Sequence, residues 1–146
     1  MVTGTHIRLV FGRAAKSIEL VDRKSIAHTG LNFSDFSILE ALLHKGPLPI
    51  NTIGEKVLLT SGSMTAAANR LEEKGLIQRV QDPSDGRCFY LYLTKDGRRT
   101  IKAAFEKHAQ NLEKLASVLS ADEQTDLVQL LKKIGRHAQE LSAKQL

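Results

Sequence analysis

Apolar residues recur in steps of three and four along most of the chain, which is the spacing of a helix that buries one face. In the first half of the chain, this pattern and its breaks at Gly30 and Gly46 predict four helices. Asn32 is placed to cap the second helix, and Thr60 or Ser61 caps the fourth. The first predicted helix begins near Ile7 and ends before Gly30, and the second lies between its cap Asn32 and Gly46. The third and fourth cover about residues 50–58 and 61–74.

The pattern changes after Gly75 from the helical repeat to the alternation of a strand. Residues 76–80 predict one strand, residues 82–86 are rich in turn formers, and residues 87–93 predict a second strand. Two short helices joined by a tight turn and followed by a hairpin predict a helix-turn-helix with a wing, whose recognition helix spans residues 61–74. The expected faces of the second strand are Phe89, Leu91 and Leu93 on one side and Cys88, Tyr90 and Tyr92 on the other.

Two further helices complete the chain. Thr94 caps a long helix that runs to about Leu119, and Ser120 and Glu123 form the capping box of the last helix. The apolar stripes of these helices and of the N-terminal helix are too long to be buried in one small winged lobe. We therefore expect them to pack on each other and on a second copy of the chain. Such a homodimer would place two recognition helices about one DNA turn apart, roughly 34–36 Å.

The predicted fold class is mostly α with a small β-hairpin wing. A winged helix-turn-helix lobe is joined to a helical dimerisation region built from both chain ends. The expected domains are an N-terminal dimerisation helix over residues 1–30, a DNA-binding lobe over residues 31–94 and C-terminal dimerisation helices over residues 95–146.

Composition excludes several classes of protein. The 146 residues include 21 Lys and Arg against 16 Asp and Glu, and the net charge of +5 suits either an acidic partner or an ordinary soluble surface. No stretch approaches the roughly 20 uncharged apolar residues of a membrane span, so we expect a cytoplasmic protein with no membrane partner. The motifs of serine hydrolases, phosphate-binding loops and zinc proteases are absent, and one cysteine and five scattered histidines form no ligand pattern. We therefore expect no enzyme activity, no cofactor and no metal site.

Three segments around the predicted wing form a distinctive pattern: LEEKGLIQR at 71–79, DPSDGR at 82–87 and LYLTKDG at 91–97. Together they resemble the signature of the MarR family of bacterial transcription regulators. Residues 31–39 and 62–65 resemble the openings of that family's second helix and recognition helix. The resemblance implies a dimeric winged-helix protein that binds double-stranded DNA, usually represses genes, and is often released by a small-molecule effector or by oxidation.

The early turns of the predicted recognition helix carry polar side chains that suit DNA. Hydroxyl and amide groups there reach base edges or phosphates, whereas the alternative is that the hydroxyl groups only cap the helix. Arg70 reaches a phosphate or pairs with Glu73 on the same helix. Many family members carry an arginine where this chain has Ala66, so sequence readout depends on other side chains or on DNA shape. The candidates on this helix are Ser61, Ser63, Thr65, Asn69 and Arg70.

Arg87 lies at the tip of the predicted wing. The resemblance implies that this arginine enters the minor groove while Asp85 orients it. Arginine suits that task because a narrow minor groove concentrates negative potential and the guanidinium stays charged. The alternative is that Asp85 and Arg87 form a pair that only holds the turn.

The resemblance also implies an effector site in the crevice between the dimerisation helices and the winged lobe. Its expected walls are Phe11, Ala15, Ile38 and Leu42, which suit a small aromatic or phenolic ligand, while ordinary core packing is the alternative for each of them. Cys88 follows a basic residue, which favours a reactive thiolate. In the redox-sensing branch of the family, however, the reactive cysteine lies in the N-terminal region, so we interpret Cys88 as a strand cysteine without a role.

Two other function classes stay open beside the effector-released repressor. One is a redox- or metal-responsive regulator of the same fold, and the other is a winged-helix module that binds proteins. The salt dependence of binding distinguishes the protein-binding module from a DNA-binding protein. The affinity of a DNA-binding protein falls steeply as salt is added, whereas that of an apolar docking surface does not.

Overall fold

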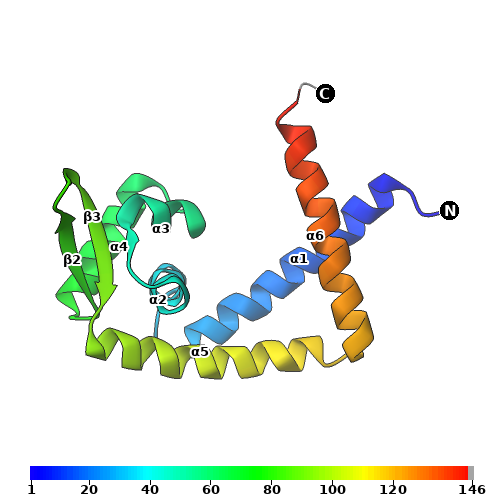
Figure 1. Cartoon of the computed structure of the whole chain (residues 1–146). Coiled ribbons are helices and arrows are strands. Elements are labelled where there is room, and N and C mark those ends of the chain that lie inside the picture. The colour runs from blue at the N-terminus through cyan, green and yellow to red at the C-terminus, as the bar shows by residue number, and fades with distance from the viewer. Residues whose placement is uncertain (145–146) are drawn as a thin grey trace. The chain divides into compact units, whose positions relative to one another are not determined.

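Residues 1–144 are described by the computed structural model and hold six helices and one three-stranded antiparallel sheet (Figure 1). This content confirms the predicted fold class, a mostly helical winged helix-turn-helix protein. The chain divides into two compact units, Met1–Ala109 and Gln110–Leu146, each of which is considered by itself. The elements are α1 (Gly4–Ala27), α2 (Phe33–Lys45), β1 (Leu48–Pro49), α3 (Ile50–Lys56), α4 (Ser61–Glu73), β2 (Ile77–Asp82), β3 (Asp85–Leu93), α5 (Lys95–Ala116) and α6 (Ala121–Ser142).

The helix starts are set by side-chain caps, most of which the sequence predicts. Asn32 Oδ1 accepts the N–H of the third residue of α2 at 2.8 Å, and Thr94 Oγ1 accepts the N–H of Gly97 at 2.9 Å. Ser120 and Glu123 form the predicted capping box of α6. Of the two candidates for the recognition helix, Thr60 is the N-cap.

Helix ends are less well predicted than helix starts. Helix α3 ends at Lys56 rather than at residue 58, because Leu58 has a left-handed backbone with a φ of 58° that a helix does not continue. Helix α5 ends at Ala116, three residues before the predicted end at Leu119. The apolar side chain at position 119 continues the helical spacing, so the periodicity alone carries the prediction too far.

The sheet has the strand order β1-β3-β2. The hairpin is longer than predicted, because Asp82 pairs with Asp85 and leaves only two residues in the turn. Strand β1 was not predicted, since two residues are too few to show an alternating pattern; its Leu48 pairs with Leu91. Leu91 is fully buried and Tyr92 is 39% exposed, as the predicted alternation of faces requires.

One hydrophobic core joins the helix-turn-helix to the sheet and to the start of α5. At the start of α5 the backbone of Gly97 approaches the backbone of Leu76 closely. A Cβ on Gly97 would lie 1.8 Å from the carbonyl oxygen of Leu76. Glycine is therefore required at this position. The fully buried large side chains of the core are Phe36, Ile38, Leu39, Leu42, Ile53, Leu71, Ile77, Leu91 and Ile101.

The two terminal helices carry apolar side chains that a single chain leaves exposed. On α1, Phe11 is 54% exposed and Val10 is similar; on α6, Leu130 is 63% exposed. Within residues 1–144, no helix has the length and the apolar character that crossing a membrane requires. In the single chain these apolar faces are exposed to water, which is unfavourable for apolar surfaces of this extent.

Candidate nucleic-acid interface

Helix α4 presents one face to the core and the other to solvent. Its buried side chains pack into the core and so fix which side of the helix faces solvent. Its first residue is set by the N-cap Thr60. The predicted residues Ser61, Ser63, Thr65 and Asn69 are all exposed. The alternative that these hydroxyl residues serve as the N-cap is wrong, because Thr60 fills that role. The Ser63 N–H donates the capping bond to Thr60 Oγ1 at 3.2 Å, and the Ser63 hydroxyl accepts from the Thr60 hydroxyl at 3.0 Å. The buried side chains of α4 are Met64, Ala67, Ala68 and Leu71.

Arg70 binds a buried carboxylate rather than Glu73. Its Nη2 donates to Asp35 Oδ1 at 2.7 Å and its Nε to Oδ2 at 3.4 Å, while Lys74 Nζ lies 3.4 Å from the same Oδ2. Asp35 is fully buried, whereas the Arg70 side chain is 40% exposed. The hydrogen bond to Asp35 raises the pKa of the Arg70 guanidinium above its ordinary value. This ion pair fixes α4 against the first turn of α2.

Arg79 is a residue at this surface that the sequence did not single out. Its Nη2 donates to Asn69 Oδ1 at 2.6 Å and its backbone N–H donates to Glu72 Oε2 at 3.2 Å. Its guanidinium carbon lies 5.9 Å from the centre of the Phe89 ring. The alternation of strand residues could have predicted this position, because Arg79 lies two residues after the buried Ile77 and so on the same face of β2.

The wing ends in a tight turn that exposes Arg87. Asp85 Oδ1 accepts the backbone N–H of Arg87 at 3.0 Å, and among the described side chains no ion pair joins these two residues. Asp85 thus holds the backbone of the turn at Arg87, and its role in orienting the arginine within a minor groove stays a prediction. Ser84 donates two hydrogen bonds to Asp82, at 2.9 and 2.8 Å, and they lower the pKa of that carboxyl.

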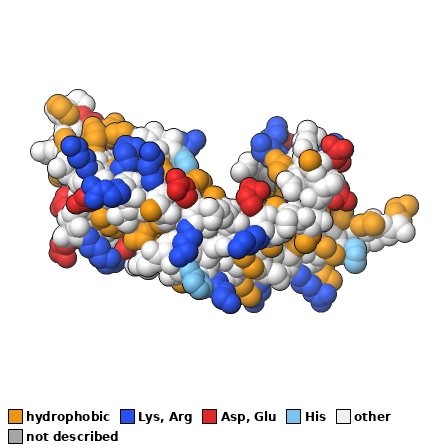
Figure 2. Space-filling view, turned by 90° about the horizontal axis from the view of Figure 1, so that it is seen from below, with side chains coloured by type: hydrophobic (Ala, Val, Ile, Leu, Met, Phe, Trp, Pro, Cys, Tyr) orange, Lys and Arg blue, Asp and Glu red, His pale blue; other side chains and the backbone are white. Residues whose placement is uncertain are grey.

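Basic side chains gather near the wing and are interspersed with acidic ones. Figure 2 shows Lys and Arg side chains close together over the end of the molecule that carries β2 and β3, with Asp and Glu among them. The net charge of +5 is thus distributed, and binding to an acidic partner depends on individual side chains.

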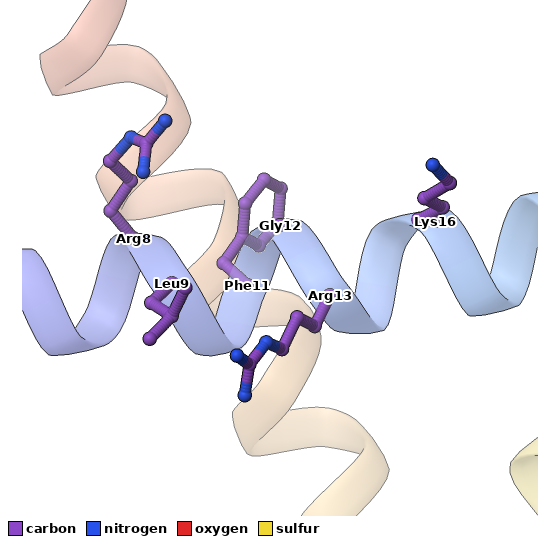
Figure 3. Close-up of a pocket in the computed structure, with 6 residues that line it drawn as sticks. All are labelled: Arg8, Leu9, Phe11, Gly12, Arg13 and Lys16. Atoms are coloured by element: carbon purple, nitrogen blue, oxygen red, sulfur yellow. The ribbon is translucent and has the colours of Figure 1, made fainter.

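The four predicted effector-site residues do not form one wall in this chain. Ile38 and Leu42 belong to the core, whereas Phe11 and Ala15 lie exposed on α1. A shallow pocket of about 400 Å³ does occur on α1 and includes Phe11 (Figure 3). The other residues lining it are Arg8, Leu9, Gly12, Arg13 and Lys16.

A buried polar cluster joins α1 to α5. His108 Nδ1 lies 2.9 Å from Ser25 Oγ, and its Nε2 lies 3.1 Å from Asp22 Oδ1. Burial raises the pKa of the nearby Glu40, an effect that His44 and His108 oppose. The sequence placed His108 in an apolar stripe, and these polar neighbours on α1 account for its burial there. In the part of the chain that is described, no group of three His, Cys, Asp or Glu side chains could hold a metal ion.

Comparison with known proteins identifies relatives along nearly the whole chain. The model of the MarR family matches residues 31–89. The HTH-type transcriptional regulator MhqR of Bacillus subtilis is 37% identical over 136 residues, which cover 93% of this chain and 94% of the relative. The uncharacterized HTH-type transcriptional regulator YkoM of the same organism is 39% identical over 132 residues, covering 90% of this chain and 86% of the relative. Among solved structures, the PcaV transcriptional regulator of Streptomyces coelicolor in complex with its natural ligand superimposes with a TM-score of 0.73 at 26% identity, covering 87% of this chain and 92% of that one.

Proposed function

The chain belongs to the MarR family of winged helix-turn-helix transcription regulators, and from this premise we propose that it is a homodimeric repressor released from its operator by a small aromatic or phenolic ligand. The observation that carries the proposal is the exposed polar face of α4, mounted on the core beside a wing with an exposed arginine at its tip. In this reading α4 lies in the major groove of double-stranded DNA and the wing reaches the minor groove. We infer that the role is regulatory rather than catalytic and that the protein acts in the cytoplasm, where its DNA is.

The residues that we assign to DNA divide by the contact they suit. Hydroxyl and amide side chains reach base edges or phosphates, and the arginines supply positive charge. The exposed part of the Arg70 side chain leaves room for a phosphate contact in addition to its bond with Asp35. The assigned residues are Ser61, Ser63, Thr65, Asn69, Arg70, Asp85 and Arg87.

The exposed apolar faces of α1 and α6 support the homodimer. Each of these faces is more extensive than the isolated apolar side chains that a monomer surface ordinarily shows. Packing of both chain ends, residues 1–30 and 95–146, against a second copy would cover them. Two recognition helices would then face successive turns of the DNA, roughly 34–36 Å apart.

The α1 pocket supports the class of effector. Phe11 offers an aromatic surface, and Arg8 and Lys16 project to the same side of α1 in Figure 3, which suits a flat ligand that carries an acidic or phenolic oxygen. PcaV, a transcriptional regulator of the same fold, has been solved in complex with its natural ligand, which supports a ligand-binding role for this fold. Ile38 and Leu42 then act as core residues rather than as walls of the site.

The proposal is tested by binding to the DNA upstream of the protein's own gene across a series of salt concentrations, with an unrelated duplex as reference. We expect preference for that DNA and a steep loss of affinity as salt rises, because each neutralised phosphate releases counterions. A chain that prefers no duplex, even after selection from random sequences, would contradict the proposal. Association that is insensitive to salt would instead favour a protein-binding module.

Replacing Arg87 with alanine is expected to weaken operator binding by about 1–3 kcal/mol, roughly 5- to 150-fold. The salt dependence should also lose about one unit of slope, since one cation leaves the interface. Because the side chain is exposed, the melting temperature and the oligomeric state should not change. Arg136→Ala, an exposed arginine on α6, is the matched control; equal affinity of the two variants would remove Arg87 from the interface.

A further inference from the structure

Two contacts hold the guanidinium of Arg79 between the wing and α4, and a third holds its backbone. Its Nη2 donates to Asn69 Oδ1 at 2.6 Å, and its guanidinium carbon lies 5.9 Å from the centre of the Phe89 ring. Its own backbone is tied to the same helix, because the Arg79 N–H donates to Glu72 Oε2 at 3.2 Å. A side chain held at both ends in this way has little freedom to release Asn69.

One nitrogen of the guanidinium is buried, whereas the bond from Nη2 to Asn69 lies at the surface. Arg79 Nε is buried and has no hydrogen-bond partner within the described chain, so this donor is already uncompensated. Losing the Asn69 oxygen as well would leave a second donor of the same guanidinium without its protein acceptor. A short bond from a charged donor, here 2.6 Å, is stronger than one between neutral groups and favours keeping the Asn69 oxygen in place.

The chemistry of arginine decides which end of the Asn69 amide faces it. A guanidinium carries only N–H donors, so the atom 2.6 Å from Nη2 is the amide oxygen. The Nδ2 group, with two donors, is consequently the end that Asn69 turns away from Arg79. Asn69 is exposed on α4, the helix that we assign to the major groove.

We propose that Arg79 is a specificity-determining residue, because by holding the oxygen of Asn69 it makes Asn69 a hydrogen-bond donor toward DNA. The inference rests on the proposed function, in which α4 enters the major groove. An asparagine that reads adenine in the bidentate manner needs its oxygen for the adenine N6 amine and its nitrogen for N7. Here the oxygen already accepts from Arg79 and faces it, so Asn69 presents Nδ2 to the groove and favours bases whose edge carries only acceptors, guanine with N7 and O6 or thymine with O4.

Asn69→Asp tests the polarity directly. The aspartate has the same shape and keeps an oxygen for Arg79, but it presents a second oxygen where the wild-type chain presents a donor. We expect at least a tenfold loss of affinity for the duplex selected by the wild-type protein. Selection from random duplexes should change at one position of each half-site, from guanine or thymine to cytosine or adenine, whose amines donate. Gln110→Glu, on α5, adds the same charge outside the helix-turn-helix and should keep the wild-type selection.

Arg79→Met tests the role of the arginine. Methionine retains the apolar stem but has no donor, so the Asn69 amide is free to rotate. The discrimination at that position should fall to within about threefold, while the remaining positions keep their preferences. Circular dichroism and the melting temperature check that the winged lobe is folded. If Arg79→Met does not fold, Asn69→Asp alone decides, because it keeps the contact with Arg79.

Three results would overturn the inference. Unchanged base selection by Asn69→Asp means that Asn69 does not read a base, and a uniform loss over all sequences means that it contacts a phosphate. Wild-type selection by a folded Arg79→Met variant means that Arg79 does not set the polarity. A wild-type protein that selects no duplex at all fails at the proposed function, and this result is seen before either variant is compared.

Discussion

Alanine in place of Gly97 is expected to destabilise the winged lobe by about 4 kcal/mol or more, which is among the largest effects of single substitutions. The added Cβ would lie 1.8 Å from the carbonyl oxygen of Leu76 and 2.8 Å from its carbonyl carbon. The backbone of Leu76 cannot easily move away, because its N–H donates to Leu71 O at 3.0 Å and its oxygen accepts from the Thr94 N–H at 3.1 Å. The start of α5 would have to shift instead, with the loss of the Thr94 cap.

The measurement is thermal or urea unfolding of the full chain. Since folded domains are stable by only about 5–15 kcal/mol, the Gly97→Ala variant should be largely unfolded at modest temperature and should lose DNA binding with it. Gly62→Ala is the control in the same lobe, because its Cβ would meet no atom within 4 Å. That change should alter stability by no more than about 1 kcal/mol. Nearly equal melting temperatures for the two variants would mean that α5 does not approach Leu76 this closely in solution.

The elements that the sequence predicted well are those encoded by neighbouring residues. A capping side chain and the N–H that it accepts lie three residues apart, as at Thr94 and Ser120, so they can be read directly from the chain. The alternation of strand residues likewise predicted the wing and the burial of Leu91. The function was predicted from the family resemblance, because the spacing of apolar and polar residues predicts helices and strands but not a function.

The contacts that were not predicted join residues far apart in the chain. Asp35 and Arg70 are separated by 35 positions, and His108 and Ser25 by 83, so no local pattern reveals either pair. Glu73 was a reasonable partner for Arg70 at helical spacing, but Asp35 is fully buried and offers a carboxylate that solvent does not reach. The competition between a local exposed partner and a distant buried one is decided by tertiary packing.

Replacing Arg70 with methionine is expected to lower the free energy of unfolding by about 2–3 kcal/mol. Removing one partner of a fully buried pair costs about 3–5 kcal/mol, and the cost is smaller here because solvent reaches part of the Arg70 side chain. The penalty arises from Asp35, a fully buried carboxyl group that would be left with Lys74, at 3.4 Å, as its cationic partner among the described residues. Lys74→Met is the matched control and should cost about 1 kcal/mol, since it leaves the shorter Arg70 contact intact.

A second change separates the structural role of Arg70 from its proposed phosphate contact. In the double variant Asp35→Asn with Arg70→Met, the buried site is neutral, so much of the lost stability should return. If Arg70 acts only through Asp35, operator affinity should return together with stability. If it also contacts a phosphate, affinity should stay reduced, with a salt slope lower by about one unit. A single Arg70→Met variant as stable as wild type would show instead that Lys74 and the first turn of α2 suffice to hold the Asp35 charge.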